Sequence, residues 1–210
     1  MSLTIIICVI TGLISYNAFS NRELFSKLLF RPVSVDREGE YYRFLTSGFV
    51  HGDMNHLFIN LFVLYQFGTF IESAFNASFG DAMGRIVFIV LYFGAIILSS
   101  VPTYFKHQNN PGYSAVGASG GTSAIVFAYV VFNPWGWFIF PPLPALLFAV
   151  GYLFYSSYMG KKGGDNIGHD AHFWGAIFGL LVTILAILAF NPDLFETIIG
   201  RFMAGPSSPF

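Results

Sequence analysis

Six apolar segments, separated by polar connections, constrain this chain more than any other feature. They are residues 3–19, 54–71, 86–101, 119–132, 143–159 and 171–190. A helix needs roughly 17–25 apolar residues to cross the hydrocarbon core of a bilayer, and most of these segments meet or approach that length. Only 10% of the residues are charged and the mean hydropathy is +0.64, whereas a soluble domain carries about 25% charged residues. The sequence therefore predicts an all-α integral membrane protein with six transmembrane helices.

The connections divide the chain into four parts. Residues 1–20 hold the first helix, which we expect to be retained because it lacks the basic start and cleavage site of a signal peptide. Residues 21–53 mix charged and aromatic side chains, as in a structured loop at the membrane interface. Residues 54–192 form the helical core, and residues 193–210 are expected to be a frayed tail. The single cysteine excludes a disulfide framework, and the net charge of -1 gives no reason to expect nucleic acid.

The fourth segment is the shortest, and a serine opens it. Its 14 residues span roughly 21 Å at about 1.5 Å per residue, less than the roughly 30 Å of the hydrocarbon core. Ser119 therefore lies below the membrane surface, where non-helical backbone is tolerated only beside a water-filled cavity. Ser114 and Ser123 are competing serines, but only Ser119 stands between the glycines of residues 117–121.

Four polar side chains lie near the starts of the even-numbered helices. His56 and Asn60 open the second, Ser119 the fourth and His172 the sixth. Since these helices run in the same direction, the four groups share one face of the membrane. Histidine can activate a serine nucleophile, and amide, imidazole and backbone N–H groups can stabilise an oxyanion. No carboxylate falls inside a predicted helix and Asp170 is poorly placed, so a Ser119–His172 dyad is expected, with His56 and Asn60 as oxyanion donors.

Small residues favour close contact between the fourth and sixth helices. Gly175 and Gly179 form a GxxxG pattern one turn beyond the histidine. This pattern lets the sixth helix approach the fourth at Gly120 and Gly121. Gly117 and Gly120 flank the serine and leave its hydroxyl clear.

A metal site is an alternative use of the histidines. Four of them lie near the same membrane face: His51, His56, His169 and His172. No carboxylate or cysteine stands beside them at a ligand spacing, so no metal or other cofactor is expected. His51 is expected to be a structural hydrogen-bonding residue of the loop.

Three motifs resemble those of the rhomboid family of intramembrane serine proteases. They are residues 42–46 through His51 with residues 56–60 (HLFIN), residues 117–120 (GASG), and residues 171–175 (AHFWG) with Gly179. The resemblance implies a six-helix rhomboid bundle whose catalytic core is residues 54–192. It implies a nucleophilic Ser119, a general base at His172, and an oxyanion hole of His56, Asn60 and the Ser119 N–H. Its substrates would be transmembrane segments of other proteins in the lipid bilayer, with no cofactor.

The resemblance also implies roles for two connecting parts of the chain. Residues 160–170 would cap the site, and the fifth helix would gate substrate access. Two departures stand out. Family members often have an aromatic residue four positions after the serine, stacked on the histidine, where this chain has Ser123. The Trp-Arg pair of the family's first loop is Tyr42-Arg43 here.

The basic residues and the resemblance predict opposite orientations. Eight Lys and Arg residues lie in the connections on the active-site side and two, Arg85 and Arg201, on the other. The positive-inside rule would place the site in the cytoplasm. The resemblance implies an extracytoplasmic site with both termini in the cytoplasm, and we follow it because five of the eight charges lie in a loop interleaved with acids. The compact six-helix form without extra domains favours a bacterial cell membrane.

Two other functions compete with proteolysis. A rhomboid-like protein without catalytic activity would bind membrane clients, which the intact Ser119 and His172 speak against. A small channel or transporter would use the polar cavity, but the sequence has neither a ring of charges nor an inverted repeat.

Overall fold

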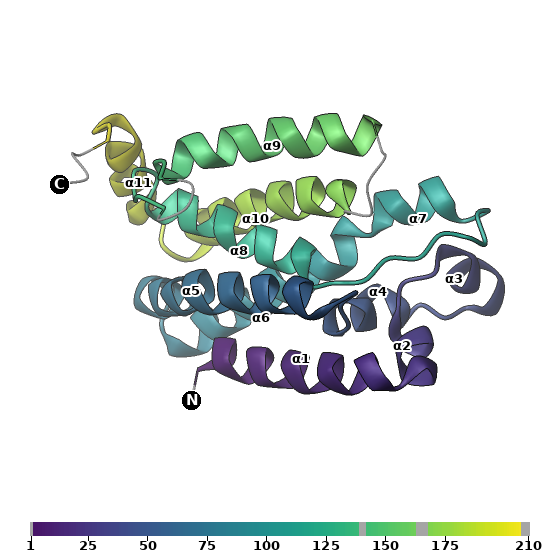
Figure 1. The fold of residues 1–210 in the computed structure, drawn as a ribbon. Coiled ribbons are helices and arrows are strands. Elements are labelled where there is room, and N and C mark those ends of the chain that lie inside the picture. Colours follow the sequence, from purple (N-terminus) through teal and green to yellow (C-terminus); the bar gives the residue numbers. More distant parts are fainter. Residues whose placement is uncertain (1, 139–141, 163–167, 207–210) are drawn as a thin grey trace.

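The computed structural model describes residues 2–138, 142–162 and 168–206, and most of these are helical (Figure 1). The helices, in chain order, are α1 (Leu3–Ser20), α2 (Arg22–Leu28), α3 (Pro32–Glu38), α4 (Arg43–Thr46), α5 (Met54–Phe79), α6 (Asp81–Ser99), α7 (Val101–His107), α8 (Ser119–Phe132), α9 (Ala145–Lys162), α10 (His169–Phe190) and α11 (Asp193–Met203). A short 3₁₀ turn, Ser47–Phe49, follows α4. The prediction of an all-α membrane protein is confirmed.

Four helical stretches in the described part of the chain are long and apolar enough to cross a membrane. They are α1, α5, α10 and the run Asp81–His107 that joins α6 to α7. The apolar α8 is shorter, with 14 residues, and α9 has 18 residues with two lysines in its last turn. Both pack against α10. That α8 and α9 also cross the membrane, which would make six crossings, remains a prediction.

The core of the bundle is α8. Every residue of this helix is buried except Ser119 and Tyr129, because α5, α6 and α10 all pack around it (Figure 1). The outer helices turn large apolar side chains away from the protein, among them Leu13, Phe58 and Leu185, each more than 60% exposed. An apolar exterior of this kind suits contact with lipid.

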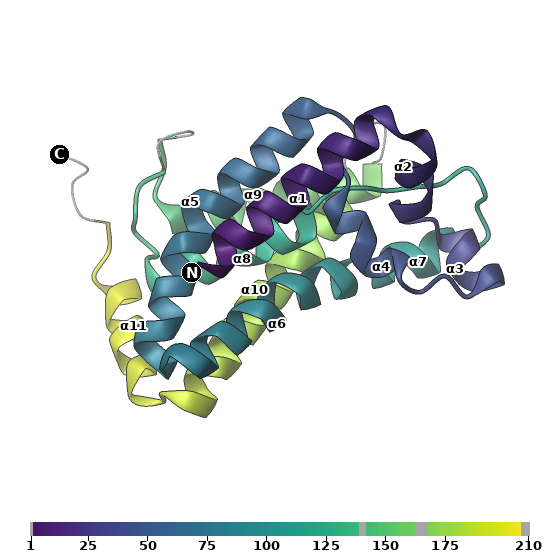
Figure 2. The ribbon, with the colours of Figure 1, turned by 90° about the horizontal axis from the view of Figure 1, so that it is seen from below.

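The two ends of the bundle differ. Figure 2 shows α2, α3, α4 and α7 gathered at one end and α11 at the other, with α1 lying along α5. Arg43 ties the first end together: its guanidinium donates to the carbonyls of Ser26 at 2.9 Å and Leu29 at 2.8 Å and pairs with Glu40. Hydrogen bonding to Arg43 holds the pKa of the Glu40 carboxyl below its ordinary value. The residues before α5 therefore form the structured loop that the sequence predicts.

The second predicted helix, α5, is longer than expected, because Glu72 lies in the middle of the helix and does not end it. The sequence places its end at Ile71, but α5 continues to Phe79. The Glu72 carboxylate accepts hydrogen bonds from the Ser2 hydroxyl at 2.6 Å, the Leu3 N–H at 2.7 Å, and the Thr4 N–H at 3.0 Å. These donors belong to the start of α1, where backbone N–H groups lack helical partners and a negative charge is favourable.

Replacing Glu72 with alanine is expected to destabilise the protein by about 3 kcal/mol, because it leaves buried N–H groups of α1 without an acceptor. Equilibrium unfolding in mixed detergent would measure the loss. Glu23→Ala is the matched control, since Glu23 is exposed in the first turn of α2. Equal unfolding midpoints for the two variants would show that Glu72 does not hold α1.

Other helix boundaries also differ from the prediction: α6 starts at Asp81 and not at Ile86, and α9 ends at Lys162 and not at Met159. Pro102 does not end the helical run but lies in the first turn of α7, where its missing N–H costs nothing. Residues 193–203 form α11 instead of a frayed tail. This helix is fastened by hydrogen bonds from the Trp135 indole to the Phe202 carbonyl at 3.1 Å and from Arg201 to the Phe132 carbonyl at 2.8 Å.

Candidate active site

The starts of α5, α8 and α10 meet at the end of the bundle that carries α2 to α4 (Figure 1). Ser119 is the first residue of α8, and His172 lies in the first turn of α10. His56 lies in the first turn of α5, with Asn60 one turn later. Ser119, His56 and His172 are partly exposed, whereas Asn60 is buried. The fold thus brings the four polar groups to one end of the bundle.

Backbone contacts with the first loop fix the segment that leads into Ser119. Phe30 and Ala115 exchange two hydrogen bonds, of 2.9 and 3.0 Å. The Gly117 N–H donates to the Ser47 carbonyl at 2.9 Å. The next N–H, that of Ala118, donates to Nε2 of His51 at 3.2 Å. The position of the serine therefore depends on the first loop as well as on α8.

His51 has a structural role at the site. The ring is fully buried, and because Nε2 accepts from Ala118, Nδ1 carries the proton and donates to the Ser15 hydroxyl at 2.9 Å. That hydroxyl donates in turn to the Phe49 carbonyl at 2.8 Å. Burial, with a smaller effect of neighbouring His56, lowers the pKa of His51 to about 3. The neutral ring thus links α1 to the segment before Ser119.

The lowered pKa of His51 predicts a loss of stability in acid. Below pH 6.5 the unfolded chain binds a proton that the folded protein excludes, so stability falls as the pH drops from about 6.5 towards 3. One proton corresponds to about 1.4 kcal/mol per pH unit. His51→Gln, which keeps an acceptor for Ala118, should flatten this slope in thermal unfolding between pH 6.5 and 4.5. Equal slopes in the two proteins would argue against a buried neutral His51.

The His56 ring lies against Gly117, two residues before the serine. Gly117 has φ +116°, and a Cβ there would come within 2.6 Å of Cε1 and 2.8 Å of Nε2 of His56. The Gly52 N–H points at Nδ1 of His56 at 3.5 Å, which leaves Nε2 to carry the ring proton. The arrangement places an N–H donor beside the backbone that precedes Ser119.

Asn60 is connected to the first turn of α8 through a residue that sequence reasoning missed. The Asn60 amide donates to the His56 carbonyl at 2.9 Å and accepts from the Thr122 hydroxyl at 3.1 Å. The same hydroxyl lies 3.2 Å from the Ser119 carbonyl. Thr122 follows the serine by three residues, a spacing that puts both on one helix face. An amide carries two N–H groups, so Asn60 has a second one to offer.

Glycines set the distance between α8 and α10. A Cβ on Gly175 would overlap the carbonyl oxygen of Gly120, and one on Gly179 would overlap that of Ala124. The backbones therefore touch next to Ser119 and one turn after His172. The other glycine of the expected contact, Gly121, faces α6 and not α10.

An aromatic ring lies beside His172 although position 123 is a serine. The ring of Tyr152 in α9 is nearly parallel to the imidazole, with centroids 6.0 Å apart and an angle of 22°. Its hydroxyl is 2.8 Å from the Ser123 hydroxyl. Sequence reasoning missed Tyr152, because nothing in the spacing of an aromatic-rich segment singles out one ring.

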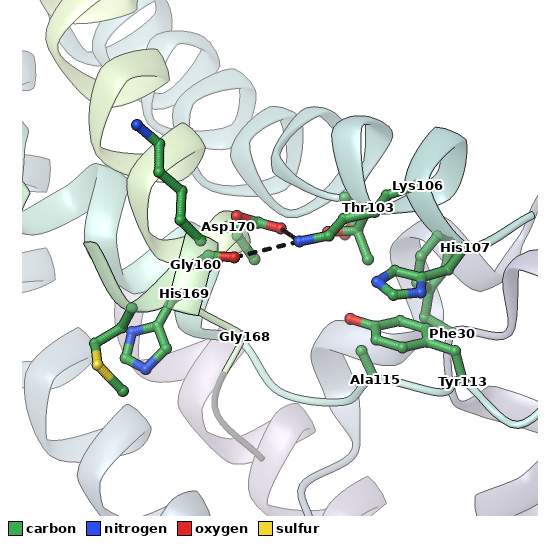
Figure 3. Close-up of a pocket in the computed structure, with 14 residues that line it drawn as sticks. Phe30, Thr103, Lys106, His107, Tyr113, Ala115, Gly160, Gly168, His169 and Asp170 are labelled. Atoms are coloured by element: carbon green, nitrogen blue, oxygen red, sulfur yellow. Dashed lines mark hydrogen bonds and ion pairs between the residues drawn. The ribbon is translucent and has the colours of Figure 1, made fainter. Parts of the chain in front are cut away.

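A cavity of about 370 Å³ adjoins the start of α10 (Figure 3). Figure 3 shows His169 on one side and the rings of His107 and Tyr113 on the other, stacked 3.7 Å apart. Between them Lys106 pairs with Asp170 at 2.9 Å and donates to the Gly160 carbonyl at 3.3 Å. The acid nearest His172 in sequence is thus engaged elsewhere. Residues 163–167, five of the eleven residues of the expected cap, lie outside the described residues.

The histidines do not form a metal centre in the part of the chain that is described. Within those residues, no three side chains of His, Cys, Asp or Glu are grouped so that they could hold an ion. The chemistry available to the site is that of hydroxyl, imidazole, amide and backbone N–H groups.

These features define a polytopic helical membrane protein with a polar site at the start of its central helix. Residues 38–189 match the Rhomboid domain family, and the chain belongs to that family. It is 28% identical over 156 residues to RHOMBOID-like protein 12, mitochondrial, of Arabidopsis thaliana, covering 69% of this chain and 46% of the relative. It is 27% identical over 142 residues to the presenilin-associated rhomboid-like protein, mitochondrial, of Rattus norvegicus, covering 65% and 36%.

A third relative is Rhomboid-related protein 1 of Caenorhabditis elegans, 26% identical over 152 residues, with 68% of this chain and 39% of that protein covered. The chain thus spans less than half the length of these relatives. Two of the three are named mitochondrial. The expected bacterial membrane has no support among them, whereas a multi-pass membrane protein is in line with the fold.

Proposed function

We propose that the protein is an intramembrane serine endopeptidase that cleaves transmembrane segments of other proteins, with Ser119 as nucleophile and His172 as general base. The observation that supports this most is the backbone contact between Gly120 and Gly175. It brings the helix that starts with the serine against the helix whose first turn holds the histidine. Family membership adds support, as does the position of His56, Ser119 and His172 in the first turns of α5, α8 and α10.

The proposed reaction is acyl transfer to serine followed by hydrolysis. The imidazole of His172 removes the proton of the Ser119 hydroxyl as the oxygen attacks a peptide carbonyl. The protonated ring then gives that proton to the leaving amine, and a water molecule, activated by the same ring, releases the acyl group. No metal or cofactor takes part. Asp170 has no role in the dyad, in agreement with its pairing to Lys106.

Three donors would stabilise the oxyanion. They are the Ser119 N–H at the start of α8, the His56 ring N–H and the Asn60 amide. The His56 ring lies against Gly117, two residues before Ser119, which supports a position of its N–H beside the substrate carbonyl that Ser119 attacks. The link of Asn60 to Thr122 supports the same for the amide.

His56→Ala and Asn60→Ala are each expected to lower kcat about 10²-fold with little change in KM, because each removes a donor that acts mainly in the transition state. Initial cleavage rates in detergent would measure the effect. Asn17→Ala is a control, since Asn17 is an exposed asparagine of α1 whose side-chain amide donates to the Leu13 carbonyl of the same helix. Full kcat in both site variants would remove these residues from the oxyanion hole.

Substrate would reach the site from the bilayer beside α9. This helix forms an outer wall next to α8 and α10 and exposes Phe154, Tyr155 and Tyr158. The site would face away from the cytoplasm. Arg43 is bound to backbone carbonyls and to Glu40. A basic residue held in this way counts for little in the positive-inside rule, which is the argument against this orientation. A reporter fused after Phe210 tests it, and an extracytoplasmic C-terminus would reverse the orientation.

Reconstitution with substrates tests the function itself. The purified protein is placed in liposomes with a panel of single-span membrane proteins, and the products are mapped by mass spectrometry. Cuts within or next to the spans are expected. Co-purification of a span without any cleavage would point instead to a client-binding protein, and solute flux without cleavage to a channel.

A further inference from the structure

The imidazole of His172 lies beside an aromatic ring from another helix, that of Tyr152 in α9. The glycine contact with α8 fixes the backbone of α10 at Gly175, one turn beyond the histidine. A backbone contact does not by itself set the rotation about the side-chain bonds of His172. Two rings lie beside the imidazole: His169 meets it edge-on, with centroids 5.9 Å apart at 76°, and Tyr152 lies nearly parallel to it. Of these two rings, Tyr152 is the one that lies against the face of the imidazole.

Tyr152 is itself held on several sides. Its hydroxyl is 2.8 Å from that of Ser123, which lies one helical turn after Ser119. Its ring is stacked on Phe148, at 5.7 Å and 27°, and is tilted against Phe127 at 5.9 Å. Both the position and the rotation of the phenol are therefore fixed by α8 and α9 together.

We propose that Tyr152 is a positioning residue, which holds the imidazole of His172 in the plane required for proton transfer, and that Ser123 fixes Tyr152 for this purpose. The inference rests on the proposed function of His172 as general base. This would explain the serine at position 123: its small side chain leaves room for the Tyr152 ring from α9, and its hydroxyl forms a hydrogen bond with the Tyr152 hydroxyl.

This arrangement couples the base to the outer wall of the site. Ser119 and Ser123 belong to α8 and His172 to α10, but Tyr152 belongs to α9. If α9 moves outward to admit a substrate, Tyr152 leaves both Ser123 and the imidazole. The proposal therefore predicts that the imidazole loses this support when α9 is not docked against α8 and α10.

Two measurements on the full chain test the proposal. The first is NMR of the His172 ring in histidine-labelled protein, which requires no activity. Tyr152→Leu should shift and broaden the His172 signals, because a ring stacked on the imidazole is removed. Phe154→Leu is the matched control, since Phe154 lies on the same helix with its side chain 74% exposed. Unchanged His172 signals in Tyr152→Leu would overturn the proposal.

The second measurement is the kinetics of cleavage. Tyr152→Leu should lower kcat by about 10²-fold with KM nearly unchanged, as expected for a misplaced base. Tyr152→Phe, which keeps the ring, should recover most of this loss. Ser123→Ala should resemble Tyr152→Phe, and the double variant should be no worse than either, because both lose the same hydrogen bond.

The outcomes separate this inference from the proposed function. A wild-type protein that cleaves no substrate, with His172 signals that respond to Tyr152→Leu, would contradict the protease while leaving the positioning intact. An active wild type with full kcat in Tyr152→Leu would contradict the positioning alone. A raised KM with unchanged kcat in Tyr152→Leu would mean that Tyr152 contacts the substrate and does not position the base, and this would also overturn the inference.

Discussion

Ser119→Ala is expected to reduce cleavage of transmembrane substrates by about 10⁴-fold or more, because removal of a catalytic serine leaves only the contribution of binding and oxyanion stabilisation. His172→Ala should have a similar effect. The double variant should be no less active than the worse single variant, because the two residues act as one unit. Rates would be measured on purified protein with a single-span substrate, in detergent and in liposomes.

Ser114→Ala is the control for this experiment. Ser114 is an exposed serine of the segment before α8, five residues from the proposed nucleophile. Its replacement should leave the rate within a factor of about two, as for most surface substitutions. Near-normal cleavage by Ser119→Ala would remove the serine from the mechanism, whatever the behaviour of His172→Ala.

Gly175→Val is expected to abolish activity and lower the stability of the fold. The new side chain would run into the Gly120 carbonyl, so α10 must move away from α8. Overpacking of this kind costs about 1–3 kcal/mol, and a displacement of about 1 Å at a catalytic group can reduce the rate about 10²-fold. Thermal unfolding and cleavage, followed on the same preparation, would show both effects.

Gly151→Val is the control, because it shows whether replacing any glycine of the bundle with valine has the same effect. Gly151 lies in α9 with no atom within 4 Å of the position of a Cβ. Its variant should unfold at a similar temperature to the wild type. A Gly175→Val protein with normal activity and stability would show that the close contact of α8 with α10 is not needed to assemble the site.

The apolar pattern predicted the positions of α8 and α10 well because local signals stop both helices. Asn133-Pro134 follows α8 and Asn191-Pro192 follows α10, and the residue before a proline is disfavoured in a helix. The segment 119–132 coincides with α8, and α10 starts only two residues before the predicted Ala171. Their polar first residues were therefore placed at helix starts from sequence alone.

Features that depend on distant partners could not be read in this way. A carboxylate in an apolar run looks like a membrane boundary, but hydrogen bonds from the start of α1 explain why Glu72 lies inside α5. The same holds for Gly121, whose packing against α6 depends on the rotation of α8. Tyr152 was missed because the partner of His172 lies on another helix.

The central claim is that Ser119 is a nucleophile activated by His172, and covalent labelling tests it most directly. The intact protein is treated with a fluorophosphonate, and the modified residue is mapped by mass spectrometry. We expect an adduct on Ser119 that is lost in His172→Ala, although the serine is still present. An adduct on Ser114 or Ser123 instead, or an unmodified Ser119 in a preparation that cleaves substrate, would contradict the account.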